Sequence, residues 1–513
     1  MQLKNQIFSV LLLLGLSGCI DLADLSDAQV PDYEAEFALP LINSRVTIKD
    51  ILDNDGSIDQ LMVDLDGTLR FQYQGTEIRR EGAEVFEQLT GDFPPVFPVL
   101  LPETRFPLSL ISDIELDRLD FKGGQLVYYF ENSNPENLSV EFEFSSLQQG
   151  GAPLRVTAEV PAFSGVGLLP AVTNRDGPID LSTYQLLPDD NEIVLRYAAK
   201  NASGQDRLLA NFVIQIQNPS FSYAEGYLGQ FVIEGVEDAV GIDFVERYAA
   251  SNIQFADPRA MLFVEHSFGV PIQAQINEFI VQNANGTEQE VESTQIDQGL
   301  SFSYPGLDEV GTMVSEIFTF DKNNSNILAL FAGNPVSMIY DVDALVNPEA
   351  NPDLVGFITD SSYYTLQLMV DLPLFGSADD YVLRDTLEFN LREEDEIERA
   401  SFKIIAENEL GVDATVQVHF LDAQGSLIET LFIDRQLIAQ AALVDDTGLA
   451  TSPAVTTTFV ETDAVRSERI RQASQMALEI GFSTETNRPN PVRILEQQGL
   501  RVKMGAIVTV RSN

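Results

Sequence analysis

Apolar and polar residues alternate at every second position along much of this chain. The alternation is unbroken over 138–144, and it recurs over 366–372, 416–420 and 500–510. Successive side chains of a strand point to opposite faces of its sheet, and strands with one solvated face belong to antiparallel sheets. The pattern therefore predicts a mainly β fold, with several antiparallel β-sandwich or barrel-like domains and a few short helices.

A unit of strand, short corner and second strand recurs along the chain. The corners are rich in Asn, Pro and Gly and are expected around 132–135, 218–219, 269–271 and 408–411. Asn and Gly tolerate positive φ, and Pro fixes φ, so such corners reverse or kink the chain. The spacing is irregular, which excludes a solenoid or propeller of fixed period. The unit is similar to that of the small β-sandwich found in late embryogenesis abundant proteins of the second class.

Few segments carry a helical pattern. Ser325 is placed to cap a short helix over 326–332. A second helix is expected over 236–249, with Val240 on its buried side. The segment 467–477 fits either a helix or a strand.

The amino terminus has the features of an export signal. Lys4 supplies a positive charge, 7–14 is apolar, and the small residues Ser17 and Gly18 precede Cys19, the only cysteine of the chain. An apolar stretch of this length is too short for a permanent membrane span. The arrangement resembles the lipobox of bacterial lipoproteins, in which the cysteine is diacylated, the preceding segment is removed and the new amino terminus is acylated.

This resemblance implies a signal peptide over 1–18, lipidation at Cys19 and a lipidated tether over 19–36. The membrane is then a partner through the lipid alone, and acylation by more than one chain makes such an anchor stable. Acidic residues behind the cysteine resemble the surface-export signal of Bacteroidota lipoproteins; they are Asp21, Asp24 and Asp27. The expected location is the outer membrane, with the cell surface favoured and the periplasmic face as the alternative.

Clusters of turn residues near 115, 250 and 395 divide the rest of the chain. The expected units are four β domains, over 37–115, 116–250, 251–395 and 396–513.

Two pairs of segments resemble uncharacterised outer-membrane lipoproteins of Bacteroidota. One pair is 38–44 with 48–52, and the other is 371–376 with 383–387. The family brings no established activity, so the resemblance implies no catalytic residue.

The chain is strongly acidic. Its 79 acidic and 30 basic residues give a formal net charge of -49, which repels nucleic acid and anionic headgroups. An apolar content of 44% excludes a disordered acidic chain. Tryptophan, a frequent stacking face for sugars, is absent.

The segment 61–69 resembles the first motif of the haloacid dehalogenase phosphatases. In that motif an aspartate attacks phosphorus and a second one moves protons, which would assign those roles to Asp64 and Asp66. Residues 70–75 follow at once and alternate like a strand. We therefore expect a β-hairpin here, with Asp66 and Gly67 in its turn.

A second acidic motif could bind calcium. Asp53, Asp55 and Asp59 surround a glycine, as in part of a calcium loop. A complete EF-hand is excluded because its first and last ligand positions would be Ile51 and Met62. A looser calcium site remains the alternative to a plain polar turn.

Other chemistry-bearing residues are sparse. His266 and His419 are expected at the surface, and no common hydrolase, metalloprotease or phosphate-binding motif occurs. Near the carboxyl end, Arg501, Lys503 and Arg511 are expected to face carboxylates of a neighbouring strand, with an acidic partner as the alternative.

These features favour an outer-membrane lipoprotein that acts as a non-enzymatic binding or structural module of the cell envelope. No cofactor is expected, apart from the open question of calcium. The partner would be an envelope protein or a glycan, and not a nucleic acid. A surface glycan hydrolase or glycan-binding protein is one alternative, since a glycosidase needs only two carboxylates. A periplasmic carrier of apolar ligands is the other.

Overall fold

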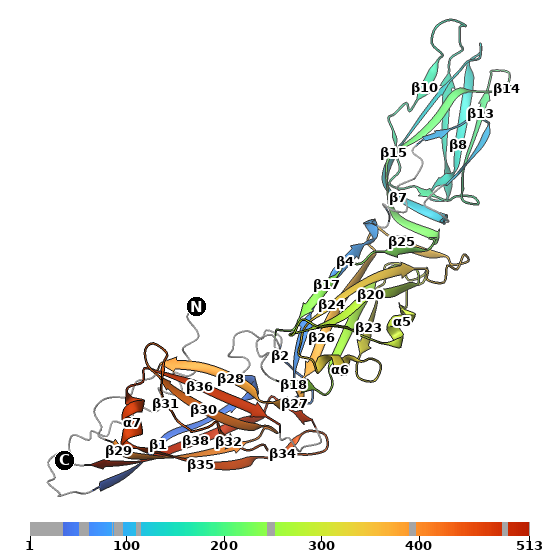
Figure 1. Ribbon diagram of the computed structural model, residues 1–513. Coiled ribbons are helices and arrows are strands. Elements are labelled where there is room, and N and C mark those ends of the chain that lie inside the picture. Colours follow the sequence, from blue (N-terminus) through green and yellow to red (C-terminus); the bar gives the residue numbers. More distant parts are fainter. Residues whose placement is uncertain are drawn as a thin grey trace.

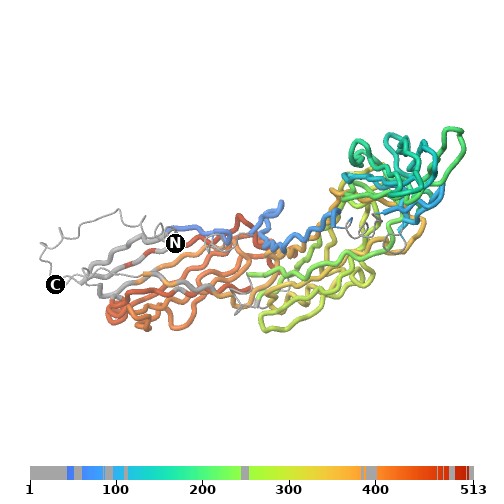
Figure 2. Tube along the Cα trace, turned by 90° about the horizontal axis from the view of Figure 1, so that it is seen from above, coloured from blue at the N-terminus to red at the C-terminus, as the bar shows by residue number. Residues whose placement is uncertain are grey.

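The protein is an elongated row of three β domains. The computed structural model describes residues 34–50, 61–84, 86, 96–108, 114–243, 252–388, 397–484 and 491–511. Nearly all of their elements are strands, and the long strands pair in antiparallel fashion. The predicted mainly β class is therefore confirmed. We name the three domains distal, middle and terminal, in the order in which they lie from top to bottom in Figure 1 and from right to left in Figure 2.

The distal domain consists of two strand layers joined by a short strand, β12, that pairs with both β7 and β8. Its buried aromatic rings meet edge to face, as Phe142 and Phe212 do at 5.4 Å between ring centres. The strands are β5 (Val96–Pro98), β6 (Glu103–Pro107), β7 (Glu115–Glu131), β8 (Leu138–Gln149), β9 (Ala152–Val160), β10 (Ala171–Thr173), β11 (Ile179–Asp180), β12 (Gln185–Leu186), β13 (Glu192–Lys200), β14 (Asp206–Arg207) and β15 (Ala210–Tyr227).

The middle domain is built on two antiparallel sheets. One has the order β2-β3-β26-β19-β23 and the other the order β16-β24-β20-β21. Its elements are β2 (Leu61–Val63), β3 (Leu69–Gln74), β4 (Ile78–Glu81), β16 (Phe231–Ile233), β17 (Asp238–Gly241), β18 (Asn252–Phe255), β19 (Arg259–His266), β20 (Ile272–Asn283), β21 (Glu288–Glu290), α5 (Thr294–Gln298), β22 (Leu300–Ser301), β23 (Val314–Phe320), α6 (Ile327–Phe331), β24 (Pro335–Val346), β25 (Gly356–Thr359), β26 (Tyr363–Pro373) and β27 (Phe375–Asp379).

The terminal domain also has two main sheets, with the orders β1-β38-β29-β35 and β28-β36-β30-β31. Its elements are β1 (Glu34–Thr47), β28 (Tyr381–Glu388), β29 (Ile397–Asn408), β30 (Asp413–Leu421), β31 (Leu427–Thr430), β32 (Gln436–Ala439), β33 (Leu443–Val444), β34 (Ala450–Ser452), β35 (Ala454–Asp463), α7 (Ala464–Arg471), β36 (Gln475–Ser483), β37 (Val492–Arg493) and β38 (Gly499–Arg511).

The chain runs out through all three domains and then returns. β1 pairs with β38 in the terminal domain, β3 pairs with β26 in the middle domain, and β5 pairs with β15 in the distal domain. The distal domain is completed next, then the middle domain and finally the terminal domain (Figure 1). Both ends of the described chain therefore lie in the terminal domain, and the distal domain lies at the far end of the row.

This path corrects the expected domain limits. The strands of 37–115 do not form an N-terminal domain, because they pair with strands of three different domains. β16 and β17 pair with β24, not with the strands of 116–250 that precede them, and β28 pairs with β36. The expected boundaries at 250 and 395 fall outside the described residues.

The distal and middle domains share one long strand. β15 pairs with β7 over its length, and its last residues pair with β25 of the middle domain. At Gly226 the backbone has a φ of 142°, and a Cβ atom there would lie 2.2 Å from the Glu115 carbonyl oxygen. Glycine is thus required where β15 crosses from one domain to the next. The buried side chains of the two domains form one continuous core.

Three of the expected corners are confirmed, one in each domain. They join β7 to β8, β19 to β20, and β29 to β30. The strand before each corner ends in Glu followed by a buried polar residue, which is Asn132, His266 or Asn408. Each of these side chains reaches a backbone carbonyl in a later segment, at 2.9 Å from Pro161, 2.8 Å from Ser303 and 2.8 Å from Gln440 respectively. The same buried side-chain-to-backbone contact thus closes a corner in every domain.

The fourth expected corner, at 218–219, is wrong. β15 continues through Asn218 and Pro219 as one strand, and its pairing with β7 shifts register on either side of them. Asn218 has a φ of 48°, so the positive φ that it tolerates is used in an irregular part of the ladder and not in a reversal.

The helix predictions have mixed outcomes. The helix over 326–332 is confirmed as α6, but its N-cap residue is Asn326 and not Ser325 as predicted. Leu328 of this helix is exposed. The ambiguous segment 467–477 contains the end of α7 and the start of β36. The prediction of a helix over 236–249 is wrong for the described residues 238–241, because they form the strand β17. Val240 is buried in this strand, which pairs with β24.

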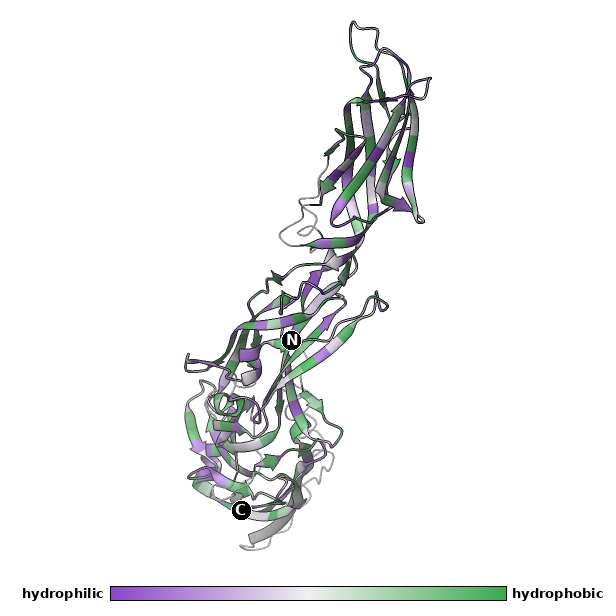
Figure 3. Ribbon diagram, turned by 90° about the vertical axis from the view of Figure 1, so that its right-hand side faces the viewer, coloured by the Kyte–Doolittle hydropathy of each residue, from purple (hydrophilic) through white to green (hydrophobic). Residues whose placement is uncertain are grey.

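Alternation within the strands accounts for their burial. β8 reads buried and exposed in turn from Leu138 to Phe142, and Figure 3 shows the matching change of hydropathy along distal-domain strands. One buried face per strand is what each two-layer domain requires.

Replacing Asn132 by Ala should lower the free energy of unfolding by about 2–5 kcal/mol, because three backbone groups lose their bonds to this buried side chain. Its Nδ2 donates to the Glu136 and Pro161 carbonyls at 2.8 and 2.9 Å, and its Oδ1 accepts from the Asn134 amide at 2.8 Å. Urea unfolding measures the change. Ser133→Ala, at an exposed position in the same corner, is the control and should cost under about 1 kcal/mol. Equal losses in the two variants would contradict the assigned role.

Candidate functional site

Four loops gather at the far end of the distal domain, and we name them the distal loops. They are 99–102, 132–137, 161–170 and 201–209. The antiparallel ladders bring them together: the end of β7 pairs with the starts of β10 and β15, and the start of β8 pairs with the ends of β9 and β13. Loop 99–102 joins them, because the Val99 amide donates to the Phe212 carbonyl and the Tyr197 amide to the Pro102 carbonyl, both at 2.8 Å.

The distal loops expose large aliphatic side chains. Val166 is 84% exposed and Leu168 is 97% exposed. Val166 lies between Gly165 and Gly167, whose φ values are 84° and 94°, and Leu168 follows the second glycine. Three further leucines of these loops are more than half exposed, namely Leu100, Leu101 and Leu208. Loops 99–102 and 161–170 carry no charged residue, although the whole chain has a net charge of -49. Clustered exposed apolar side chains on a monomer mark interaction sites.

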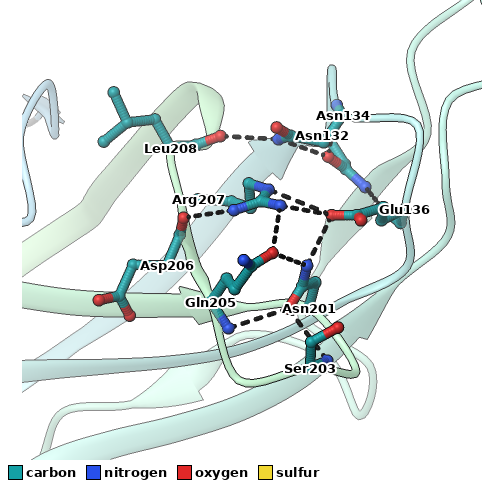
Figure 4. Close-up of polar contacts among 9 residues, drawn as sticks. All are labelled: Asn132, Asn134, Glu136, Asn201, Ser203, Gln205, Asp206, Arg207 and Leu208. Atoms are coloured by element: carbon teal, nitrogen blue, oxygen red, sulfur yellow. Dashed lines mark hydrogen bonds and ion pairs between the residues drawn. The ribbon is translucent and has the colours of Figure 1, made fainter.

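Beneath these side chains, Asn132 and Asn134 connect three of the loops (Figure 4). Asn132 is fully buried and donates to Pro161 at the start of loop 161–170. Asn134 donates through Nδ2 to the Leu208 carbonyl at 3.0 Å, and its own carbonyl accepts from the Phe163 amide at 2.8 Å. The backbone of the exposed loops is therefore fixed by buried or half-buried amide groups.

A second polar group holds loop 201–209 against the corner (Figure 4). Asn201 accepts from the Ser203 and Gln205 amides at 3.0 and 2.9 Å, and its Nδ2 donates to Glu136 Oε2 at 2.9 Å. The Arg207 guanidinium lies 3.0 Å from the same carboxylate oxygen. This network fixes the loop that carries Leu208.

The charges in this network favour a structural role for the Glu136 carboxylate over a role in acid–base chemistry. The hydrogen bond from Asn201 and the charge of Arg207 lower the pKa of Glu136 below its usual value of 4.5. An ionised carboxylate already engaged by an arginine and an amide is a poor proton donor. The contacts of Glu136 therefore order loop 201–209.

Several residues singled out in the sequence lie outside the described residues. These are the lipidation residue Cys19 and the calcium candidates Asp53, Asp55 and Asp59. Within the described residues, no three His, Cys, Asp or Glu side chains are arranged to hold a metal ion. None of the helices in that part of the chain is long and apolar enough to cross a membrane.

The hairpin prediction for Asp64 and Asp66 is confirmed. β2 pairs with β3, and the Gly67 amide donates to the Asp64 carbonyl at 2.9 Å within a loop somewhat longer than the two residues expected. Asp64 forms an ion pair with Arg70, whose guanidinium also lies 3.0 Å from the buried Asp371. Asp66 accepts from the Thr68 amide at 2.9 Å, which lowers its pKa. Both aspartates thus serve the turn and its ion pairs.

The histidines and the carboxyl-terminal cations have separate outcomes. His266 is buried and not at the surface as expected, and its burial lowers its pKa, so the ring is neutral. His419 is half-buried on β30. Arg501 faces Glu407 across β29 and β38 at 3.8 Å, as predicted. Lys503 pairs in register with Ile405, and the side chain of Arg511 lies outside the described part.

The sequence analysis missed the distal loops. A signal for them was present, because the runs Val99-Leu100-Leu101-Pro102 and Val166-Gly167-Leu168-Leu169-Pro170 are apolar and end in proline. Neither run alternates, so neither is a typical one-sided strand. That they lie together depends on pairings between distant strands, which the local pattern does not contain.

Comparisons with known proteins give no family. No family model matches the chain, and no curated protein matches it. Among solved structures, it is similar to a candidate secreted protein from Parabacteroides distasonis, at 9% identity and a TM-score of 0.30 over 92% of this chain and 99% of that one. It is also similar to the VP2 subviral particle of infectious bursal disease virus, at 11% identity and a TM-score of 0.15 over 78% and 74%. At such values neither structure informs the function.

The network around Glu136 should make loop 201–209 sensitive to acid. Because the folded pKa lies below 4.5, the ordering by the carboxylate is complete above that value and is lost as the pH falls through the folded pKa. Hydrogen exchange should show protection of the Ser203 and Gln205 amides declining there. In Glu136→Gln their protection should be weaker at neutral pH and should vary less with pH. Identical profiles for the two chains, with β8 amides as internal control, would contradict this role.

Proposed function

We propose that this chain is a lipid-anchored envelope protein whose distal loops bind a protein partner through aliphatic contacts. The observation that carries the proposal is the set of exposed aliphatic side chains on loops held by a polar network, at the end of the row opposite Glu34 and Arg511, the two ends of the described chain. The proposed activity is binding without catalysis. The proposed location is the outer membrane, on the cell surface or the periplasmic face.

Two features support anchoring through Cys19. The lipobox-like run before it has the charge, apolar segment and small residues of an exported lipoprotein. The first described residue, Glu34, pairs with Arg511 in the terminal domain, so a tether at this end places the distal loops farthest from the anchor. Such a layout suits a protein that meets its partner at a distance from the membrane.

The energetics of the distal loops support binding. Burying an exposed Val or Leu side chain contributes about 1.5–3 kcal/mol, so burial of these side chains against a partner favours association. The hydrogen bonds of Asn132, Asn134 and Asn201 fix the loop backbones before binding, which reduces the entropy lost on association. Loops held by a rigid scaffold commonly carry the binding residues of β-sandwiches.

The chemistry of the loops favours a protein with an apolar patch over other partners. The net charge of -49 repels nucleic acid and anionic lipid headgroups. The large exposed side chains of loops 99–102 and 161–170 are aliphatic, whereas sugars are commonly stacked on aromatic rings. Of these partner classes, a protein surface that exposes apolar side chains of its own matches the loops best.

The anchor is tested by Cys19→Ser. Without the thiol no thioether to lipid can form, so the altered chain should move from the membrane fraction to the soluble fraction of lysed cells. Mass spectrometry of the unaltered chain should show acyl groups on Cys19. An acyl-free native chain, or a Cys19→Ser chain that stays in the membrane fraction, would refute the anchor.

The binding surface is tested by photo-crosslinking in intact cells. A photoreactive residue at Leu168 should give one discrete adduct with another protein, and Val166→Ser should reduce its yield several-fold. Leu443, 66% exposed in the terminal domain, is the matched control and should give no such adduct. Equal adducts from both positions, or an adduct only between two copies of this chain, would count against the proposed partner.

A further inference from the structure

An apolar cavity of about 130 Å³ lies between the middle and terminal domains. One wall comes from β18 and β27 of the middle domain, including Ile253 and Phe375. The other comes from the terminal domain, including Val412 and Phe482. The cavity therefore exists only where the two domains meet.

The buried cores of the two domains are separate at this point. The distal and middle domains share one continuous core, while the terminal domain has smaller clusters of its own. Ile48 and Tyr381 pack against both the large core and a terminal cluster, and both line the cavity. The cavity is thus a gap in the packing between two cores.

Hydrogen bonds across the junction hold the walls of the cavity in fixed positions. β27 pairs with β18 on one edge and with β37 of the terminal domain on the other. The Ile494 amide donates to the Leu374 carbonyl at 2.9 Å, and the Leu374 amide donates to the Leu69 carbonyl at 2.7 Å. Backbone bonding in several directions prevents the walls from moving together to fill the space.

Two residues of the walls, Ala378 and Thr484, bond to each other through polar groups. The Ala378 carbonyl accepts from the Thr484 amide at 2.8 Å and from the Thr484 hydroxyl at 3.1 Å. The remaining lining is mostly aliphatic and aromatic hydrocarbon. Water in such a space has few partners, whereas an apolar group regains the contacts that the gap lacks.

We propose that this junction cavity binds the end of an alkyl chain. An apolar cavity of roughly 150 Å³ holds one benzene molecule, so the space fits a short hydrocarbon segment. The cavity is partly open to solvent, which leaves room outside it for the polar part of such a molecule. The alkyl chain could belong to a membrane lipid or to a free amphiphile. This site is independent of the distal loops and of the anchor.

The absence of tryptophan from the chain allows a direct test. Phe482→Trp places a single fluorophore in the cavity wall, and Phe459→Trp places one at a position that is 64% exposed in the same domain. Each chain is titrated with 1-bromooctane, and separately with phosphatidylcholine vesicles whose acyl chains are brominated. Bromine quenches tryptophan on contact. Phe375→Trp is a second reporter in the opposite wall, for the case that Phe482→Trp fails to fold.

The cavity reporter should show saturable quenching, and the Phe459→Trp chain only a weak linear decrease. Adding Val412→Phe to the cavity reporter fills the space and should weaken the apparent affinity by about tenfold. Saturation with 1-bromooctane alone indicates a free amphiphile, and saturation with vesicles indicates a membrane lipid. Linear quenching of both reporters by both probes, or unchanged affinity in the Val412→Phe chain, would overturn the proposal.

Discussion

The pairing of β1 with β38 is the constraint on which the rest of the structure depends. It joins the first described strand to the last one in the terminal domain. Strands β2 to β4 then belong to the middle domain, and β5 and β6 belong to the distal domain. The chain therefore runs outward before any domain is complete. The result is a row with both ends of the chain at one extremity and the distal loops at the other (Figure 1). Long-range pairings of this kind close large loops, so they form late in folding.

Within the row, the three domains repeat one local solution to the same problem. Two strands must meet at a corner whose backbone groups are buried, and a side chain of Asn132, His266 or Asn408 bonds to the backbone there. In the distal domain this corner has a second consequence, because Asn134 and Glu136 of the same corner hold the loop that carries Leu208. The structural element of the repeat has thus become the base of the proposed binding surface.

Much of the secondary structure could be predicted from the sequence, because one-sided strands leave a period of two. β8 and β30 were predicted in this way, and so were the corners at Asn132 and Asn408. The Asn218–Pro219 corner failed because a long strand absorbs the same residues in a shift of register. The domain limits failed because local patterns do not say which distant strand a given strand will join. The distal loops were missed for the same reason, and the cavity depends on side chains from two domains.

The central claim is that the proposed binding surface stands at the end of the molecule remote from its anchor. Cys19 is the only cysteine and would carry lipid, so a cysteine introduced elsewhere can be labelled alone with a fluorescent donor. Leu168→Cys reports on the distal loops, and Val465→Cys reports on exposed α7 in the terminal domain. With the lipidated chain in vesicles that contain a headgroup acceptor, energy transfer should be strong from position 465 and weak from position 168. Equal transfer from the two positions would contradict the account.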